Sequence, residues 1–593
     1  MTSLIKNKTM VWKIRAKQLL SFLGFSKKKS FSNKDADLQL VYKLSPHKIP
    51  SGRQLRHLNK FLNPRENLIL KICLLVILIN VVYLSVVFLK KHIEYVPIVG
   101  GDYTEALVGY PKAINPIYVA NRDVDADLSR LIYSSLFVYD KNGHLGNDLA
   151  DSFTLSDDGK EYIVKIKNNV FFHNNEKLTV DDILFTIDLI KNSEYHSPFR
   201  ASLANVEAEK IDDYTIKFSL SQPYAPFLEL LSFGVLPKNI WKNVNPQSIL
   251  LFEFNLKPIG SGPYKFKSLL KNKDGDLKEY HLTINDNYYG LKPYIKNINF
   301  KFFVDYIEAV KSLNDNQVNG LSYLPYDNNK DLLAKNSLSI NELERPQIIS
   351  LFFNKEKVKS LSDKATRVAL SEAINKKQLV DDVFGGSYKV ADGPIPASSF
   401  AFNDKLTKYD FNPGAASDVL RDKLLTLTLS VIDRTENLAA ADKIKNYWEL
   451  AGVKVIIKAI PAEQITDVIK NRDFEVLLYG ESVGGDPDVY VFWNSTQIGG
   501  KGLNLAAYSN PAVDKLLVDA RVAISTSERT LKYQKFQEII NNDFPVIFLY
   551  SPTYKYIQDK KIKGFDETVI IDPADRFSGV SSWYLKTKSK LIW

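Results

Sequence analysis

The feature that most constrains this chain is an apolar run near its N-terminus. Residues 72–89 read ICLLVILINVVYLSVVFL, which is about as long as a helix must be to span a bilayer core. Lys71 precedes the run, and Lys90, Lys91 and His92 follow it. The sequence therefore predicts one membrane helix over 68–91, with lipid contact through 72–89.

Charge is distributed unevenly about this run. Residues 1–66 contain 15 lysines and arginines against three acidic residues, whereas residues 93–593 carry a net charge of −5. Basic flanks stay in the cytoplasm, so we expect a partly disordered cytoplasmic tail over 1–67 and an extracytoplasmic body. The tail charge fits this orienting role, and we expect no nucleic-acid partner.

A cleaved signal peptide is the main alternative to an uncleaved anchor. The apolar run is longer than a signal core, the tail before it is long, and no A-x-A-like site follows it. Cys73 is the only cysteine, and the sequence before it is a poor lipidation signal. The exported body has no disulfide, so its stability must come from core burial.

Helix-like and strand-like segments alternate through the body. EYIVKIK alternates apolar and polar residues and predicts a half-exposed strand over 161–167. Thr179 then opens a helical pattern with acidic residues in its first turn. A helix over 439–450 ends at Gly452, before another alternating strand. This order predicts an α/β body whose sheets are covered by helices.

The sequence contains only incomplete matches to catalytic and metal-binding patterns. Gly480–Gly484 matches the G-x-S-x-G pattern around Ser482, but all seven histidines precede it, so a hydrolase elbow is disfavoured. Asp123, Asp125 and Asp127 resemble the start of a calcium loop, but its glycine and final glutamate are missing. We interpret these aspartates as solvated charges, and we predict no catalytic residue, metal or cofactor.

Several segments resemble family 5 of the solute-binding proteins of ABC importers, which includes dipeptide and oligopeptide binders. The block over 131–190 resembles the family pattern in order and spacing, from its LADS motif to its FH and VDD motifs. Other matching segments follow in the family's order: 258–266 (PIGSGPYKF), 287–290, 353–354, 367–374, 385–396, 452–455, 486–488 and 510–511. The resemblance covers about residues 100–570.

The resemblance implies a bilobed periplasmic-binding-protein clamshell of class II, preceded by the membrane helix. Lobe I is expected over 100–300 plus 541–593, with an inserted subdomain at about 116–200. Lobe II is expected over 301–540. Two chain crossings would form a hinge, and ligand would bind in the cleft between the lobes.

The resemblance also implies candidate ligand-binding residues. An arginine before a helix binds the peptide carboxylate in dipeptide binders, and Arg434 has this position. An aspartate before the Asp-Pro segment binds the amine, but Val483 replaces it here, so Glu481 or Asp486 is expected to substitute. The remaining candidates are Trp493, Tyr479, Gly109, Tyr110, Gly262 and, from the family's FN motif, Asn354.

The predicted function is binding a small peptide without altering it, and delivering it to an ABC permease and its ATPase. A longer peptide, a sugar, a nickel chelate or an opine-like solute remains an alternative. A tethered sensor or adhesion module on the same fold is the alternative from another class.

Overall fold

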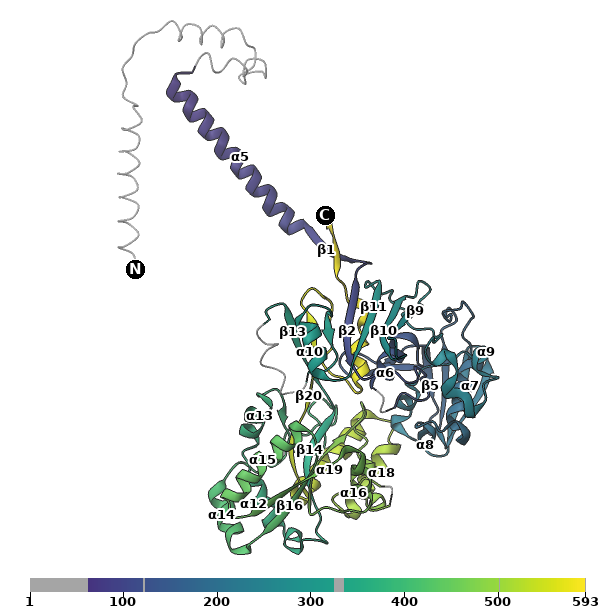
Figure 1. Cartoon of the computed structure of the whole chain (residues 1–593), viewed down its shortest axis with the longest axis vertical. Coiled ribbons are helices and arrows are strands. Elements are labelled where there is room, and N and C mark those ends of the chain that lie inside the picture. The colour runs from purple at the N-terminus through teal and green to yellow at the C-terminus, as the bar shows by residue number, and fades with distance from the viewer. Residues whose placement is uncertain (1–61, 121–122, 325–334, 501, 592–593) are drawn as a thin grey trace. The chain divides into compact units, whose positions relative to one another are not determined.

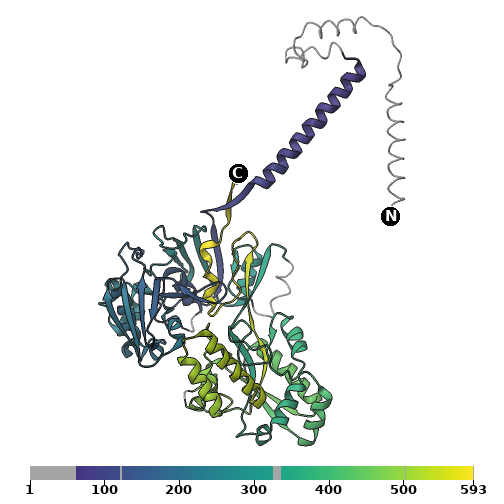
Figure 2. The ribbon, with the colours of Figure 1, turned by 180° about the vertical axis from the view of Figure 1, so that it is seen from behind.

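The structure is a computed structural model, which describes residues 62–120, 123–324, 335–500 and 502–591. Residues 96–588 form one compact unit (Figures 1 and 2), and the segment that contains the apolar run belongs to a second unit. Most of the predicted basic tail lies outside the described residues.

The apolar run forms helix α5, Pro64–His92. Its start is capped by Glu66, whose carboxylate accepts the Asn63 N–H at 2.8 Å, and its last turn holds three basic residues. No α5 side chain is buried. Among the described residues, α5 is the one helix long and apolar enough to cross a membrane. The predicted helix over 68–91 lies within it.

Lobe I is built on a seven-stranded sheet of order β13-β20-β12-β2-β11-β10-β9. Strand β2 lies inside it, in parallel register with both β11 and β12. The strands are β2 (Asp102–Val108), β9 (Tyr264–Lys271), β10 (Leu277–Ile284), β11 (Asn297–Phe303), β12 (Gly320–Leu321), β13 (Leu338–Glu344) and β20 (Thr553–Asp559). Its main helices are α6 (Asp123–Ile132) and α10 (Tyr306–Asn314).

An inserted subdomain carries a separate four-stranded antiparallel sheet of order β5-β6-β8-β7. Its strands are β5 (Ala150–Leu155), β6 (Glu161–Ile166), β7 (Val206–Asp212) and β8 (Thr215–Leu220), with helix α7 (Val180–Lys191) beside them. Strand β6 buries every second residue, as its alternation predicts. The subdomain sheet spans 150–220, and so extends beyond the predicted boundary at 200.

Lobe II is built on a six-stranded sheet of order β15-β19-β14-β18-β16-β17. These strands are β14 (Gln347–Phe353), β15 (Lys389–Val390), β16 (Thr426–Ile432), β17 (Lys454–Ile460), β18 (Val476–Ser482) and β19 (Val546–Ser551). Both faces are buried, because neighbouring residues such as Phe352 and Phe353 belong to two different core clusters. The covering helices include α12 (Lys364–Glu372), α13 (Lys376–Phe384), α14 (Pro413–Leu420), α15 (Thr435–Leu450), α18 (Pro511–Val522) and α19 (Thr526–Asp543).

The remaining elements are short. The strands are β1 (Ile93–Ile98), β3 (Phe137–Tyr139), β4 (Leu145–Asn147) and β21 (Lys586–Leu591). The helices are α8 (Arg200–Leu203), α9 (Lys238–Trp241), α16 (Ile465–Lys470) and α17 (Tyr490–Trp493). Two 3₁₀ segments, η2 (Ala225–Leu231) and η10 (Pro573–Phe577), contribute to the contacts described below.

The chain crosses between the two large sheets twice. The first crossing, residues 345–346, joins β13 to β14, and the second, at Pro552, joins β19 to β20. The structure thus places lobe II over about 347–551, whereas the sequence predicts 301–540. The difference arises because β12 and β13 pair with β2 and β20, which are distant in the chain, to complete the lobe I sheet.

Candidate ligand-binding cleft

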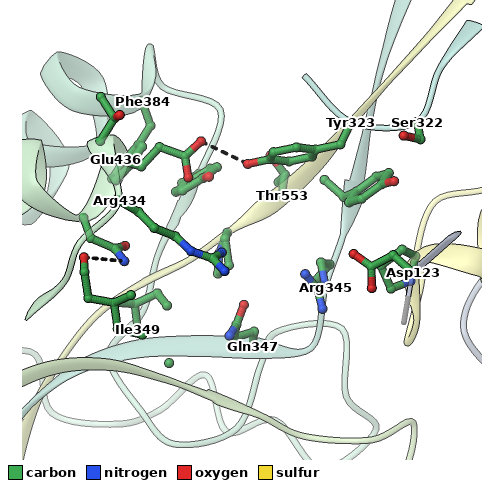
Figure 3. A pocket seen from close by; sticks show the side chains of 18 of the residues that line it. Asp123, Ser322, Tyr323, Arg345, Gln347, Ile349, Phe384, Arg434, Glu436 and Thr553 are labelled. Carbon is green, nitrogen blue, oxygen red and sulfur yellow. Dashed lines mark hydrogen bonds between the residues drawn. The ribbon is translucent and has the colours of Figure 1, made fainter. Parts of the chain in front are cut away.

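A cavity of about 770 Å³ lies where the two lobes and the two crossings meet. This volume falls within the range of small-molecule binding pockets. Figure 3 shows the guanidinium of Arg434 on one side of the cavity and the carboxylate of Asp123 on the other, with Arg345 and Gln347 between them in this view. Lobe I, lobe II and the first crossing therefore each contribute charged or polar groups.

Two arginines line the cavity with no partner for their guanidiniums among the described residues. Arg434 follows β16 and immediately precedes α15, so its side chain projects from the carboxyl end of a strand. Arg345 lies in the first crossing, and its Nε is buried with no hydrogen-bond partner. No ion pair or side-chain hydrogen bond joins either guanidinium to another described residue. Both are available to an anionic ligand.

The acidic residues of the cavity differ in the partners that they bind. Asp127 binds the buried guanidinium of Arg576, with oxygen–nitrogen distances of 2.5 and 2.6 Å. Glu436 accepts a hydrogen bond from the Tyr323 hydroxyl at 3.0 Å. Asp123, one helical turn before Asp127 on α6, remains exposed to the cavity.

Electrostatics link Asp123 to the arginines. Desolvation raises the pKa of Asp123 above its ordinary value, and the positive charges of Arg345 and Arg434 act in the opposite direction. Among the described residues, the Asp123 carboxylate and the guanidiniums of Arg345 and Arg434 thus have no ion-pair or side-chain hydrogen-bond partner. Such an arrangement suits a ligand that carries charges of both signs.

Aromatic side chains form the apolar part of the wall. The rings of Tyr306 and Tyr323 meet edge to face at 5.8 Å, and the rings of Phe384 and Tyr388 stack at 4.2 Å. Burial raises the pKa of Tyr306 to about 12, so its hydroxyl is protonated at neutral pH. These rings offer apolar contact together with hydroxyl groups.

Comparison with known proteins identifies the family to which this architecture belongs. Residues 144–502 match the family described as bacterial extracellular solute-binding proteins, family 5 Middle. This match covers more than half of the chain. The chain belongs to family 5 of the bacterial extracellular solute-binding proteins. The resemblance noted in the sequence is thereby confirmed, and so is the bilobed α/β fold that it implies.

Individual relatives match along most of their length. The oligopeptide-binding protein AppA of Bacillus subtilis (strain 168) is 28% identical over 512 residues, which cover 82% of this chain and 92% of AppA. The dipeptide-binding protein of Escherichia coli (strain K12) is 26% identical over 517 residues, covering 80% and 93%.

Solved structures of binding proteins also align with most of this chain. Bacillus subtilis AppA in complex with a nonapeptide aligns over 83% of this chain and 100% of its own, with a TM-score of 0.66 and 26% identity. The binding protein CtaP of Listeria monocytogenes aligns over 82% and 99%, with a TM-score of 0.73 and 25% identity.

The structure brings two of the nine predicted site residues to the cavity, Arg434 and Tyr479. Tyr479 lies on β18, next to Gly480, which also lines the cavity. Its neighbour Glu481 is not among the lining residues, because its side chain is buried beside the lobe II sheet with one carboxylate oxygen unpartnered. Burial raises the pKa of Glu481 well above its ordinary value.

The other predicted acidic ligand, Asp486, is occupied within the protein. Its carboxylate forms an ion pair with Arg529 of α19, and both side chains are largely buried. Val483, at the position of the family's amine-binding aspartate, belongs to a core cluster of lobe II. Neither residue therefore supplies a free negative charge to the cavity.

The remaining predicted residues have packing roles. Trp493 is fully buried among lobe II aromatics. Asn354 binds backbone groups of its own loop and of Arg472. A side-chain carbon at Gly262 would lie 2.6 Å from the Leu131 carbonyl oxygen, which explains why glycine is required there. Gly109 and Tyr110 lie next to cavity residue Val108, with the Tyr110 ring against Phe302.

The sequence prediction missed Asp123 and Arg345. Asp123 is interpreted from the sequence, with Asp125 and Asp127, as a solvated charge, yet the latter two are buried. Asp125 accepts backbone N–H groups from residues 112 and 113 at 2.8 and 3.1 Å. The i, i+4 spacing of Asp123 and Asp127 on a helix is a signal that could have placed both on one face.

Proposed function

We propose that this family 5 protein is the substrate-binding subunit of an ABC importer, and that it captures a short peptide in the cleft between its lobes. The proposal is supported by the family assignment and by relatives named as dipeptide-binding and oligopeptide-binding proteins. A permease with its ATPase would receive the ligand. The protein binds its ligand without altering it.

The observation that carries the proposal is the separation of unpaired charges in the cavity. A peptide zwitterion has a carboxylate and an ammonium group, and both must be paired when water is excluded. Arg434 pairs the carboxylate from lobe II, and Asp123 pairs the ammonium from lobe I. Binding across the cleft stabilises the closed arrangement of the lobes over the open one.

The first test measures peptide affinity by calorimetry on the full chain in detergent. Arg434→Gln removes a charged hydrogen-bond donor, so we expect the binding free energy of Ala-Ala-Ala to weaken by about 1.5–3 kcal/mol. The C-terminal amide of the same peptide should bind the wild type and the variant equally well. Equal affinity of both proteins for the free-acid peptide would contradict the assignment.

The same experiment tests the other end of the ligand. N-acetylation removes the ammonium, so the acetylated peptide should bind the wild type more weakly than the free peptide does. Asp123→Asn should abolish that difference. Arg421→Gln is the matched control, because Arg421 is exposed and does not line the cavity.

The membrane part of the proposal rests on α5 and on the charge distribution around it. We infer that α5 stays in the mature protein as a single-pass anchor, with the basic tail in the cytoplasm and residues 96–588 outside. Tethering keeps the binding protein near its permease, so that capture and delivery take place at one membrane surface.

A further inference from the structure

The cavity contains one cation, Arg345, that no described acidic residue pairs directly. If Arg434 binds the peptide carboxylate and Asp123 binds the ammonium, Arg345 still has no partner. Its guanidinium faces the same cavity, and its Nε is already removed from water. Arg345 is half-buried, and closure of the lobes would remove more of it from water. A peptide with neutral side chains would then leave this charge without a partner, which is costly.

The described acidic groups of the protein do not pair with Arg345. Asp127 is held by Arg576, and Glu436 accepts a hydrogen bond from Tyr323. Glu481, where the family resemblance suggested a substitute acid, is buried away from the cavity. No carboxylate among the described residues lies within 4.0 Å of the Arg345 guanidinium.

Arg345 is also held in place before any ligand arrives. Its backbone carbonyl accepts hydrogen bonds from the Gln347 N–H at 2.7 Å and from the Ser551 hydroxyl at 3.3 Å. The next residue, Pro346, accepts the Val483 N–H at 2.7 Å. These hydrogen bonds hold the backbone of the first crossing against the end of β19 and the residue after β18. Less conformational entropy is therefore lost when the guanidinium binds an anion.

We propose that Arg345 is a specificity residue that binds a second anionic group of the ligand, so that the cleft selects peptides with an acidic side chain. This inference rests on the proposed function. The ligand class is a short peptide with three charged groups: its ammonium, its terminal carboxylate and a side-chain carboxylate. The planar guanidinium can bind that carboxylate through two parallel hydrogen bonds.

The test is a glutamate scan of tripeptide ligands. Six peptides place Glu, or its uncharged isostere Gln, at each position of an Ala-Ala-Ala background, and calorimetry measures their affinities for the full chain in detergent. We expect Glu to bind about 10- to 100-fold more tightly than Gln at one position in the wild type. Arg345→Gln should reduce that ratio to about one, and Arg421→Gln should leave it unchanged.

A second variant keeps the test decisive if Arg345→Gln is unstable. Arg345→Lys keeps the charge but loses the planar fork, so the ratio should fall yet remain above one. Peptide binding with a Glu-to-Gln ratio of one at every position would overturn this inference and leave the proposed function intact. A preference that survives in Arg345→Gln would overturn the assignment to Arg345. Failure of all six peptides to bind would overturn both proposals.

Discussion

At the scale of single residues, the wall of the cleft depends on one buried guanidinium. Arg576 is completely buried in η10 and forms ion pairs with Glu105 and Asp127 at 2.7 and 2.5 Å. The hydroxyls of Tyr103 and Tyr556 donate to the other oxygen of Glu105 at 2.6 and 2.7 Å. This cluster joins β2, α6, β20 and the C-terminal segment behind the cavity.

Removing that guanidinium should destabilise lobe I strongly. Arg576→Met leaves two buried carboxylates without a counter-charge, so we expect a loss of about 3–5 kcal/mol in the free energy of unfolding. Denaturant titration of the full chain in detergent, followed by tryptophan fluorescence, measures this. The exposed Arg421→Met should change stability by less than about 0.5 kcal/mol. A similarly small loss for Arg576→Met would show that the cluster contributes little.

The family pattern makes Arg434 a candidate from the sequence, because it precedes a helix at a place that the family uses. The structure puts Arg434 in the cavity, and its contact with a ligand stays a prediction. Arg345 and Asp123 are not among the candidates from the sequence. Their place in the cavity depends on where the first crossing and α6 meet in three dimensions. No local sequence pattern encodes that meeting point.

At the scale of elements, a contact between η2 and lobe II joins the two halves of the large unit. Glu229 of η2 packs against the loop that follows β18. A side-chain carbon at Gly484 would lie 2.9 Å from one carboxylate oxygen of Glu229, and one at Gly485 would lie 3.0 Å from the other. Beside it, the Tyr224 hydroxyl donates to Asp488 at 3.2 Å. We call the contact of Glu229 with Gly484 and Gly485 the flank contact.

The flank contact should make lobe closure depend on pH. Burial, with a smaller effect of the Asp486 carboxylate, raises the pKa of Glu229 to about 7. Opening returns the carboxyl to water, where its pKa is about 4.5. Closure therefore takes up a proton between these values, and the closed fraction should rise as the pH falls from about 7 to about 4.5.

Energy transfer between one fluorophore on each lobe measures this closure in the full chain. Cys73 is the only cysteine, so Cys73→Ser permits specific labelling at introduced sites. Glu229→Gln should flatten the dependence between pH 7 and 4.5, and His144→Gln controls for the histidine near the same loop. An unaltered pH profile in Glu229→Gln would rule out this contact as the source.

Individual elements were predictable where side-chain periodicity is strong. The strand at 161–166 and the helix that begins after Thr179 follow from alternation and from a capping pattern, and the structure confirms both. The helix predicted over 439–450 begins four residues earlier, at Thr435. Only Asp433 and Arg434 separate this helix from β16, so the linker is too short to mark the boundary.

At the scale of the whole molecule, the proposed orientation can be checked on intact cells. With 15 basic residues in 1–66 and a net charge of −5 beyond residue 92, we expect the large unit to lie outside. Protease added to cells should cleave residues beyond 92 while a tag at the N-terminus stays protected. A cytoplasmic marker controls for lysis, and full protection of the large unit would reverse the topology.

The bilobed architecture followed from the order of family motifs, but the lobe boundaries did not. Strands β12 and β13 contribute to lobe I through partners on β2 and β20, more than 200 residues away in each case. Alternation within a strand indicates how it is buried, but it does not identify the strand beside it. The limits at 301 and 541 therefore differed from the crossings at 345–346 and 552.

The positions of the two crossings in the chain also determine the order in which the two lobes can fold during synthesis. Residues 347–551 contain every strand of the lobe II sheet, so that half can complete its core as soon as it emerges. The lobe I sheet cannot be completed until β20 is made, because β20 pairs with both β12 and β13. Arg576 follows β20 in the chain. During synthesis, β12 and β13 are made more than 200 residues before β20, the strand that both of them pair with. Long-range pairing of this kind is slow and prone to aggregation.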